Sequence, residues 1–534
     1  MQEAGWWIDK TMDDFMRHSL EMHPDKEALI CYRSDRVQPE RVTYRQLNQR
    51  VNLAASGLHR LGVRHGDVVA LQLPNWTEFV IATLACGRIG AVVNPLMHIF
   101  RERELSYMLG FTQAKVLIAP LAYRGFNFSE MAQGLKATLP SLEHVIVVDG
   151  LQENSFETAL QSGSSLNGTD MSEDVRALQP DDLAVLMFTS GTTGTPKGVM
   201  HTSNTLVSCM NALSGRFGLG KEDVFLASTP VGHMTGYVAV LLIGLRQGGT
   251  VVLQDFWEPV KAAQILTNER VSYFAGSTPF LNDLCEVVEA GQAAPVHLRS
   301  FLCGGAPIPP ILIERAVTTL GIKVCSLWGM TEVLSGTLTE PDRAHEKSSC
   351  SDGRALEGME ILVVDDNGRP CATGQPGRLW VRGAQMFLGY YKLPEIQAFN
   401  AQGWFDSGDL AYSDTEGYIR ICGRTKDVLI RGGENVPVVE IEGLLSRHPS
   451  IQANAIVGYP DPRLGERACA FVVLRPGQTL SLSDLQVYMQ QSKVAKQYWP
   501  EKLLVIDQMP ATPSGKIQKF KLKELASSSP SHSK

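Results

Sequence analysis

One stretch of this chain combines glycines, small hydroxyl side chains and a lysine, and it reads Phe188-Thr189-Ser190-Gly191-Thr192-Thr193-Gly194-Thr195-Pro196-Lys197-Gly198-Val199. It overlaps the end of residues 183–188, a continuous apolar run with the composition of a buried strand. Glycines and small hydroxyl residues expose backbone N–H groups and side-chain donors at short range, which suits a polyphosphate. The stretch therefore predicts a phosphate-binding loop at the end of a buried strand.

The loop does not follow the Walker A pattern of P-loop nucleotidases. That pattern needs glycine directly before the lysine and serine or threonine directly after it. Here Pro196 precedes Lys197 and Gly198 follows it. A P-loop NTPase is therefore excluded, and an ordinary glycine-rich connector remains the alternative as long as the loop is considered by itself.

Outward from the loop, short apolar runs alternate with helical patterns. The runs at residues 68–71, 115–118 and 145–148 are rich in valine, isoleucine and leucine. Ahead of them, apolar residues at spacings of 4, 3, 4 and 3 predict one face of an amphipathic helix between residues 47 and 61. Continuous apolar strands that alternate with helices predict an α/β fold with parallel sheets covered on both faces.

The pattern changes after about residue 359. Short strands at residues 359–364, 378–381 and 418–421, separated by Gly, Asp and Pro turns, predict a small, more antiparallel, β-barrel-like unit. A helical stretch near residues 437–445 and later apolar strands then predict a compact α+β domain in the last hundred or so residues.

Composition and charge narrow the class of function. The chain has 534 residues, of which 44% are hydrophobic and 20% charged, and its net charge of -7 offers no broad basic field for nucleic acid. The longest strongly apolar run, residues 237–245, is far short of the ~20 residues that an integral membrane segment needs. The ten cysteines form no CxxC pair and the twelve histidines no HExxH, so a site with only protein ligands for a metal is not expected, and the unpaired thiols indicate a cytoplasmic protein.

Five further motifs follow the loop in order, and together with it they resemble the signatures of the adenylate-forming superfamily of acyl-CoA synthetases, non-ribosomal adenylation domains and beetle luciferases. These motifs are Cys303-Gly304-Gly305-Ala306-Pro307, Trp328-Gly329-Met330-Thr331-Glu332, Trp404-Phe405-Asp406-Ser407-Gly408-Asp409-Leu410, Gly423-Arg424-Thr425-Lys426-Asp427 with Arg431-Gly432-Gly433-Glu434-Asn435, and Thr512-Pro513-Ser514-Gly515-Lys516-Ile517. The last motif is one residue shorter than in the family. Taken alone, each motif could be an ordinary turn, helix cap or solvated charge. The occurrence of all six motifs in the family's order outweighs these alternatives, and the resemblance covers about residues 20–523.

The resemblance implies a set of nucleotide-binding residues. We expect ATP and AMP to contact Thr189, Ser190, Gly191, Thr192, Thr193, Gly194, Lys197, Gly305, Ala306, Pro307, Trp328, Gly329, Met330, Thr331, Asp409, Arg424 and Lys516. Asp409 would accept from the ribose hydroxyls, much as an acidic residue does in dinucleotide folds. Glu332 would hold Mg²⁺, which is satisfied by one carboxylate together with phosphate oxygens.

The same resemblance implies a two-step ligase with a mobile C-terminal domain. Lys516, Thr331, Glu332 and His233 would be the catalytic residues, and Lys426 the hinge. Gly432 and Gly433 would line the CoA tunnel in a second conformation. The implied domains are residues 1–425 for AMP and acyl binding, residues 426–523 for the mobile domain, and residues 524–534 as a disordered tail.

The segment after residue 229 indicates which class of carboxylic acid the enzyme would use. His233, Met234, Gly236, Tyr237 and Gly304 would line the acyl pocket by resemblance. No aspartate or glutamate occurs between residues 229 and 245, which favours an uncharged acyl chain over an amino acid. Residues 301–305, 463–467 and 494–496 resemble bacterial short- to medium-chain fatty acyl-CoA synthetases, and residues 94–101 resemble cyclohexanecarboxylate-CoA ligases.

The leading hypothesis is therefore an ATP-dependent acid-CoA ligase for a medium-chain or alicyclic carboxylic acid, with Mg²⁺, ATP and CoA. The serious alternative is an enzyme that loads an acyl-adenylate onto a carrier protein. A luciferase-like oxygenase needs no additional motif, and a non-catalytic adenylate binder would not need the charge-stabilising Lys516. The oligomeric state is not predicted.

Overall fold

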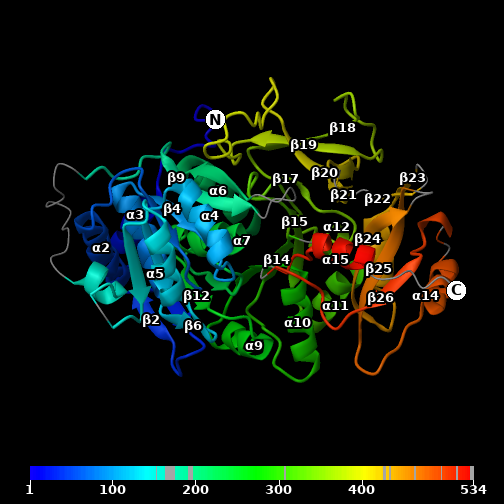
Figure 1. Cartoon of the computed structure of the whole chain (residues 1–534), viewed down its shortest axis with the longest axis horizontal. Coiled ribbons are helices and arrows are strands. Elements are labelled where there is room, and N and C mark those ends of the chain that lie inside the picture. The colour runs from blue at the N-terminus through cyan, green and yellow to red at the C-terminus, as the bar shows by residue number, and fades with distance from the viewer. Residues whose placement is uncertain are drawn as a thin grey trace.

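The computed structural model describes residues 1–151, 153–162, 175–189, 196–305, 308–424, 429–431, 434–461, 465–492, 494, 496–512 and 515–528. Figure 1 shows two α/β layers at the left and centre, an antiparallel β-unit above them, and the C-terminal unit at the right. None of the helices in these ranges is long and apolar enough to cross a membrane. All ten cysteines are present as free thiols.

The first sheet carries the predicted phosphate loop at one edge. Its strands follow the order β10-β9-β4-β3-β5-β8 within the described ranges, and all neighbours are parallel except β9 and β10. Their bounds are Lys197–Thr202 (β10), Leu183–Thr189 (β9), Val92–Pro95 (β4), Val68–Leu71 (β3), Val116–Pro120 (β5) and His144–Val148 (β8). Thr189 pairs with Lys197, so the glycine-rich loop joins two antiparallel strands.

The helices beside this sheet follow the predicted periodicity. Helix α2 (Tyr44–Arg60) confirms the amphipathic helix, because Leu47, Val51 and Leu58 are fully buried. Thr43 and Gln46 form a capping box at its start, which satisfies N–H groups that have no partner inside the helix. The other helices of this part are α1 (Met12–Met22), α3 (Thr77–Ile89), α4 (Glu102–Thr112), α5 (Phe128–Thr138), the π-turn η1 (Glu157–Gln161) and α6 (Ser203–Phe217).

The second sheet supplies most of the remaining site residues. Its order within the described ranges is β17-β16-β15-β14-β13-β11-β12-β1-β2, with parallel central strands and antiparallel pairs at both edges. The bounds are Arg354–Ala355 (β17), Thr337–Leu338 (β16), Lys323–Trp328 (β15), Ser300–Gly304 (β14), Tyr273–Gly276 (β13), Val224–Ala227 (β11), Thr250–Gln254 (β12), Glu27–Tyr32 (β1) and Glu40–Thr43 (β2). Helices α9 (Pro259–Asn268), α10 (Thr278–Glu289) and α11 (Pro310–Leu320) share one apolar cluster with this sheet.

The apolar run at residues 237–245 does not form one regular α-helix. The segment consists of a short helix α7 (Met234–Gly236), a π-helical turn η2 (Tyr237–Leu242) and α8 (Ile243–Arg246). Every residue of η2 is buried. A π-turn inserts an extra residue and re-aims the side chains around it, which an apolar sequence pattern does not reveal.

The antiparallel β-unit and the C-terminal unit are separate sheets. The β-unit has the order β18-β19-β20-β21, with bounds Met359–Val364, Gly377–Gly383, Phe405–Ser413 and Ile419–Arg424. The C-terminal sheet has the order β23-β22-β25-β24, with β26 beside β25, and bounds Glu434–Val436, Leu429–Arg431, Gly465–Leu474, Ile451–Asp461 and Lys502–Val505. Small helical segments complete the chain: α12 (Ala344–Lys347), α13 (Val438–Leu445), α14 (Leu482–Gln491), η3 (Lys496–Tyr498) and α15 (Lys519–Ser528).

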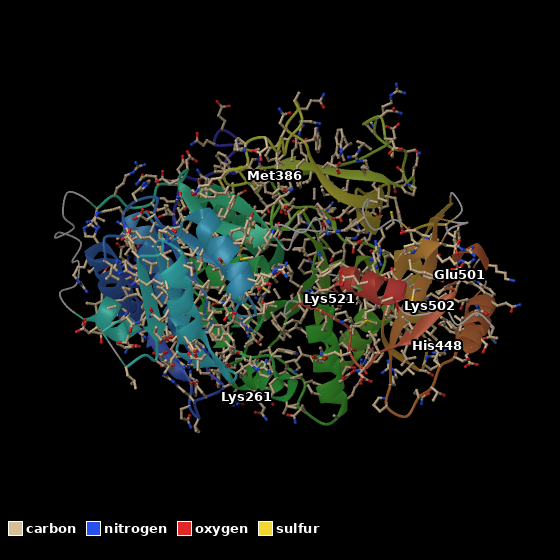
Figure 2. The ribbon with its side chains drawn as sticks, in the orientation of Figure 1. Lys261, Met386, His448, Glu501, Lys502 and Lys521 are labelled. Atoms are coloured by element: carbon tan, nitrogen blue, oxygen red, sulfur yellow. The ribbon has the colours of Figure 1, made fainter. Side chains whose placement is uncertain are left out.

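Labelled side chains show where these units lie in the molecule. Figure 2 shows Lys261 on α9 at the base, Met386 in the upper part beside the β-unit, and His448, Glu501 and Lys502 in the C-terminal unit. Helix α15 continues past the predicted start of the tail at residue 524, because Leu522 and Ala526 are buried in the C-terminal unit's own apolar cluster. The predicted tail therefore begins too early, and residues 529–534 lie outside the described residues.

Candidate active site

A buried carboxylate connects the second sheet with the β-unit, next to the residue at which the β-unit ends and the chain continues to the C-terminal domain. Asp409 on β20 is 3% exposed, and its two oxygens have different donors. The Trp328 indole at the end of β15 donates to Oδ2 at 2.8 Å, and the Arg424 guanidinium at the end of β21 donates to Oδ1 at 2.7 Å. A carboxylate has about four acceptor positions, so about two remain for further donors. This geometry fits the predicted contact with ribose hydroxyls.

A second buried carboxylate belongs to Glu332, in the turn after β15. The Tyr390 hydroxyl donates to Glu332 Oε1 at 3.0 Å, and the Lys197 ammonium lies 4.8 Å from the centre of the Tyr390 ring. Burial raises the pKa of the Glu332 carboxyl, while the Tyr390 hydroxyl and the charges of Arg424 and Lys197 act in the opposite direction. Tyr390 therefore connects the predicted metal ligand with the lysine of the phosphate loop.

The position of Thr331 is fixed by a histidine that sequence reasoning missed. His201 on β10 is fully buried, and its Nε2–H donates to the Thr331 carbonyl at 2.8 Å. The opposite ring nitrogen lies 3.1 Å from the Thr205 hydroxyl. Burial lowers the pKa of His201 to about 4, so the ring is neutral at pH 7 and the carbonyl fixes which nitrogen carries the proton. His201 and Tyr390 have no recognisable local signal, since each acts on a residue far away in the sequence.

The C-terminal domain brings Lys516 to the large domain. A Cβ atom added to the neighbouring Gly515 would lie 2.4 Å from the Ser277 hydroxyl oxygen and 3.0 Å from Pro279 Cγ, so the loop touches the start of α10. The pKa of His233 is lowered to about 4, mainly by burial of the ring and, to a smaller extent, by the positive charge of Lys516. Lys516 therefore lies within electrostatic range of His233 in this domain arrangement, although 283 residues separate them in the sequence (516 minus 233).

His233 begins the segment that was predicted to line the acyl pocket. Its Nδ1 accepts from the Thr235 backbone N–H at 3.3 Å, so Nε2 carries the proton of the neutral ring. Gly236 lies against the preceding loop, because an added Cβ atom would come within 2.5 Å of the Pro230 and Thr229 carbonyl oxygens. Met234 and Tyr237 are buried.

The remaining predicted residues fall into two groups. Gly304 ends β14, packed against the Leu327 carbonyl, and Gly305 follows in the left-handed region at φ 82 with no atom near its Cβ position, which suits the flat approach of a base. Thr189 ends β9, and Gly329 and Met330 lie between Trp328 and Thr331. Outside the described residues lie Ser190, Gly191, Thr192, Thr193, Gly194, Ala306, Pro307, Lys426, Gly432 and Gly433.

Within the described residues, no three His, Cys, Asp or Glu side chains come together as metal ligands. The structure does bring together Lys197, Trp328, Glu332, Asp409 and Arg424 through direct contacts or their charges, with His233 and Lys516 as a second pair. Two acidic groups held by cationic and aromatic neighbours, among them the lysine that follows the glycine-rich stretch, together with a lysine from a second domain, are typical of adenylate-forming enzymes.

Comparison with known proteins agrees with this class. The model of the AMP-binding enzyme family matches residues 16–391, and that of the AMP-binding enzyme C-terminal domain matches residues 440–516. The chain belongs to the AMP-binding enzyme family.

Individual relatives cover almost the whole chain. A medium-chain fatty-acid–CoA ligase from Escherichia coli (strain K12) is 37% identical over 98% of this chain and 92% of its own length. A salicylyl-CoA synthase / salicylate adenylyltransferase from a Streptomyces species is 32% identical over 98% and 95%. The solved structure of o-succinylbenzoate CoA synthetase (MenE) from Bacillus subtilis, in complex with an acyl-adenylate intermediate, superposes with a TM-score of 0.82 at 26% identity and covers 96% of this chain and 98% of its own.

Proposed function

We propose that this chain is an ATP-dependent acid-CoA ligase that acts on a medium-chain or alicyclic carboxylic acid. The carboxylate attacks the α-phosphate of ATP to give an acyl-adenylate and diphosphate, and the CoA thiol then displaces AMP. The observation that carries the proposal is the approach of Lys516 to His233 across the contact between Gly515 and Ser277. That approach brings a cation from the C-terminal domain toward the predicted acyl pocket.

The physical problem of the first step is charge, because a carboxylate must approach a triphosphate. Lys516 would orient the carboxylate and offset the charge that develops at the α-phosphate. Asp409 would hold the ribose with its remaining acceptor positions, kept in place by Trp328 and Arg424. His233, neutral and protonated on Nε2, would present a donor without repelling Lys516.

A magnesium ion fits Glu332. The carboxyl group is buried at 6% exposure, and one of its oxygens is held by Tyr390. Mg²⁺ takes few protein carboxylates and completes its shell with phosphate oxygens and water. When bound there, it would withdraw charge from the triphosphate. The positive charge of Lys197 opposes the rise in the Glu332 pKa that burial causes, so a second cation would act on the same carboxyl group as Mg²⁺.

The proposal also specifies the kind of acyl chain and the thiol that accepts it. The buried residues of η2 are all apolar apart from the hydroxyl of Tyr237, which supports an uncharged acyl group. The Escherichia coli relative is named for medium-chain fatty acids, and the Streptomyces relative for both CoA ester formation and adenylation. The free thiols of all ten cysteines agree with a cytoplasmic location, which belongs to the same proposal.

A product assay tests the function. Enzyme, ATP and Mg²⁺ are mixed with short-chain, medium-chain and ring carboxylic acids, with and without CoA, and AMP, acyl-adenylate and acyl-CoA are measured by mass spectrometry. CoA-dependent acyl-CoA from a medium-chain or alicyclic acid is the expected result. Adenylate without thioester would favour a carrier-protein acceptor, and the absence of AMP with every acid would contradict the proposal.

Tyr390→Phe is expected to weaken the response to Mg²⁺. The substitution removes the hydroxyl that fixes Glu332, and a hydrogen bond to a charged group is worth about 1.5–3 kcal/mol. We expect the Mg²⁺ concentration for half-maximal AMP formation to rise roughly tenfold or more on that scale. Tyr391→Phe is the matched control, since the Tyr391 ring packs against Phe111 instead. Equal Mg²⁺ curves for wild type and Tyr390→Phe would contradict the assigned contact.

Lys426→Pro tests the proposed hinge. Rotation of the C-terminal domain would carry Lys516 away from His233 so that the thiol can enter, and proline fixes φ near −65°. We expect the variant to form acyl-adenylate at close to the wild-type rate and to lose thioester formation. Equal loss of both half-reactions would count against Lys426 as the hinge.

A further inference from the structure

Tyr107 on α4 contacts the chain at both ends of the glycine-rich stretch. Its ring lies edge to face against Phe188, near the end of β9, at 6.4 Å between ring centres. Its hydroxyl donates to the Pro196 carbonyl at 3.2 Å, and Pro196 directly precedes Lys197. Residues 190–195, between these two ends, lie outside the described residues. One side chain from a helix therefore contacts the chain where it enters the stretch and where it leaves it.

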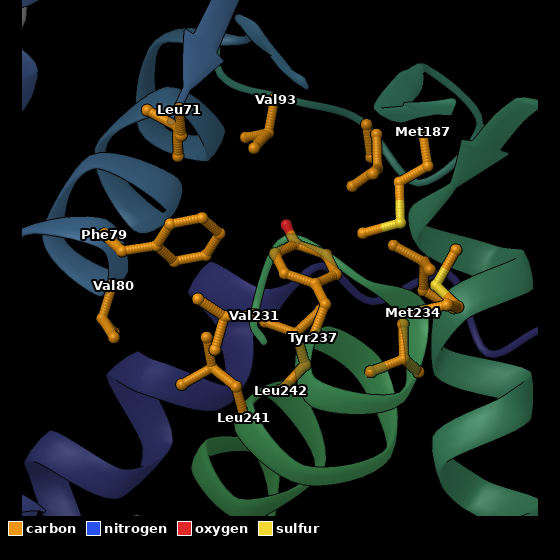
Figure 3. Packing of buried hydrophobic residues seen from close by; sticks show 14 of the residues in the cluster. Leu71, Phe79, Val80, Val93, Met187, Val231, Met234, Tyr237, Leu241 and Leu242 are labelled. Carbon is orange, nitrogen blue, oxygen red and sulfur yellow. The ribbon is translucent and has the colours of Figure 1, made fainter. Parts of the chain in front are cut away.

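The direction of Phe188 follows from the alternation of side chains along β9. Figure 3 shows Met187, its neighbour on this strand, pointing into the core toward Tyr237. Successive side chains of a strand point to opposite faces, so Phe188 lies on the other face of the sheet. There it meets Tyr107 and also Phe111, which stands one helical turn further along α4. The two rings of α4 are stacked at 5.6 Å between centres, so the helix presents a paired aromatic surface to the end of β9.

The chain that leaves the glycine-rich stretch is bonded on both sides of Lys197. Before the lysine, the Pro196 carbonyl accepts from Tyr107. After it, the Gly198 carbonyl accepts from the Tyr391 backbone N–H at 2.8 Å. The lysine side chain extends from this held backbone, and its ammonium lies 4.8 Å from the centre of the Tyr390 ring.

Packing alone does not account for the hydroxyl of Tyr107. The side chain is half-buried, and a phenylalanine would keep the ring contacts with Phe111 and Phe188. The hydroxyl adds a hydrogen bond to a backbone carbonyl beside a lysine that is predicted to bind phosphate. The Pro196 carbonyl and the Lys197 N–H belong to one planar peptide group, so a bond to that carbonyl restrains the backbone from which the lysine side chain extends.

We propose that Tyr107 is a positioning residue for ATP, which holds the peptide group between Pro196 and Lys197 so that the lysine is directed at the triphosphate. This inference rests on the proposed function, because it takes Lys197 to contact the phosphates of ATP. A lysine on a loosely held backbone loses more conformational freedom when it binds phosphate, and holding it beforehand lowers that cost. The contribution belongs to the first half-reaction, since diphosphate has left before the thiol attacks.

Tyr107→Phe is the direct test, and binding of Mg²⁺-ATP in the absence of acid is its first readout. We expect the Kd for ATP to rise roughly two- to tenfold, which corresponds to the net contribution of one uncharged hydrogen bond. The KM for ATP in AMP formation should rise by the same factor. The KM for the acid and the rate of thioester formation from supplied acyl-adenylate should stay at their wild-type values, whereas a general loss of packing would change them as well.

Tyr44→Phe is the matched control. The Tyr44 hydroxyl also donates to a backbone carbonyl, that of Gly249, at 2.8 Å, and its side chain is fully buried at the start of α2. The variant loses the same kind of hydrogen bond and should keep the wild-type Kd for ATP. Thermal unfolding of the two variants shows how much stability each has lost, so that an effect on ATP binding is separated from an effect on the fold.

A double-mutant cycle tests whether Tyr107 acts through Lys197. Because Lys197→Ala removes the ammonium, adding Tyr107→Phe to it should raise the Kd for ATP no further. An undiminished effect of Tyr107→Phe in that background would overturn the inference, as would a wild-type Kd for ATP in Tyr107→Phe alone. If the wild type binds ATP but forms no AMP with any acid, the proposed function fails, and the binding data still decide the inference. If the wild type binds no ATP, both fail together.

Discussion

Lys516→Ala is expected to slow acyl-adenylate formation by roughly a hundredfold or more, since one fixed donor aimed at developing charge is worth on the order of 3 kcal/mol in a transition state. The contact between Gly515 and Ser277 holds this lysine at the large domain, and its charge reaches His233. Alanine leaves the carboxylate and the α-phosphate without that cation. Single-turnover release of diphosphate, with acid and ATP saturating, measures the step.

The second half-reaction supplies the internal control for Lys516. Thioester formation from supplied acyl-adenylate and CoA should fall far less, because the α-phosphate no longer needs activation by attack from a carboxylate. Lys521→Ala is the matched variant: this exposed lysine lies on α15, and its ammonium is 5.9 Å from the Phe520 ring centre. Wild-type adenylation in Lys516→Ala would remove the catalytic assignment.

The class of fold was predictable because its signals are local. Runs of consecutive apolar residues, such as residues 68–71 and 145–148, became β3 and β8 in a parallel sheet. The spacing of apolar residues in α2 correctly predicted which face of the helix is buried. Asp409, Arg424 and Trp328 were predicted to bind the nucleotide because they stand in motifs, each of which is a short continuous stretch.

The contacts between these motifs were not predictable, because they join residues far apart. Trp328 donates to Asp409 across 81 positions, Tyr390 donates to Glu332 across 58, and His201 donates to Thr331 across 130. No periodicity or composition relates such pairs; only the folded sheets bring them together. The motifs therefore indicated candidate binding groups, whereas the side chains that contact these groups became visible only in the structure.

The π-helical turn at Tyr237 was missed for a different reason. A run of apolar residues predicts burial equally well for an α-helix, a strand or a π-turn, since burial depends on side-chain chemistry and not on the hydrogen-bond register. The register decides which side chain faces Phe79 and a cavity of about 50 Å³. Here that residue is Tyr237.

Acidification is expected to reduce the contribution that the buried His201 makes to the stability of the fold. Burial lowers the pKa of His201 to about 4 from 6.5, and the pKa values of His98 and His233 are lowered in the same direction. Between pH about 4 and 6.5 these histidines therefore bind more protons in the unfolded chain than in the folded one, so their contribution to the free energy of unfolding falls as the pH falls through this window. His201 alone contributes a loss of about 2 kcal/mol by pH 5 and about 3 kcal/mol below pH 4.

His201→Gln isolates this contribution, because glutamine can still donate to the Thr331 carbonyl but does not titrate. Urea unfolding at pH 7 and pH 5 should show the wild type losing about 2 kcal/mol more than His201→Gln. His18→Gln, at an exposed position of α1, should keep the wild-type difference between the two pH values. The comparison is needed because Glu332 acts in the opposite sense: its raised pKa makes the folded state the better proton binder as acid is added. If wild type and His201→Gln lose the same free energy, the ring of His201 is not held neutral by burial, and the fixed donor assigned to Thr331 is wrong.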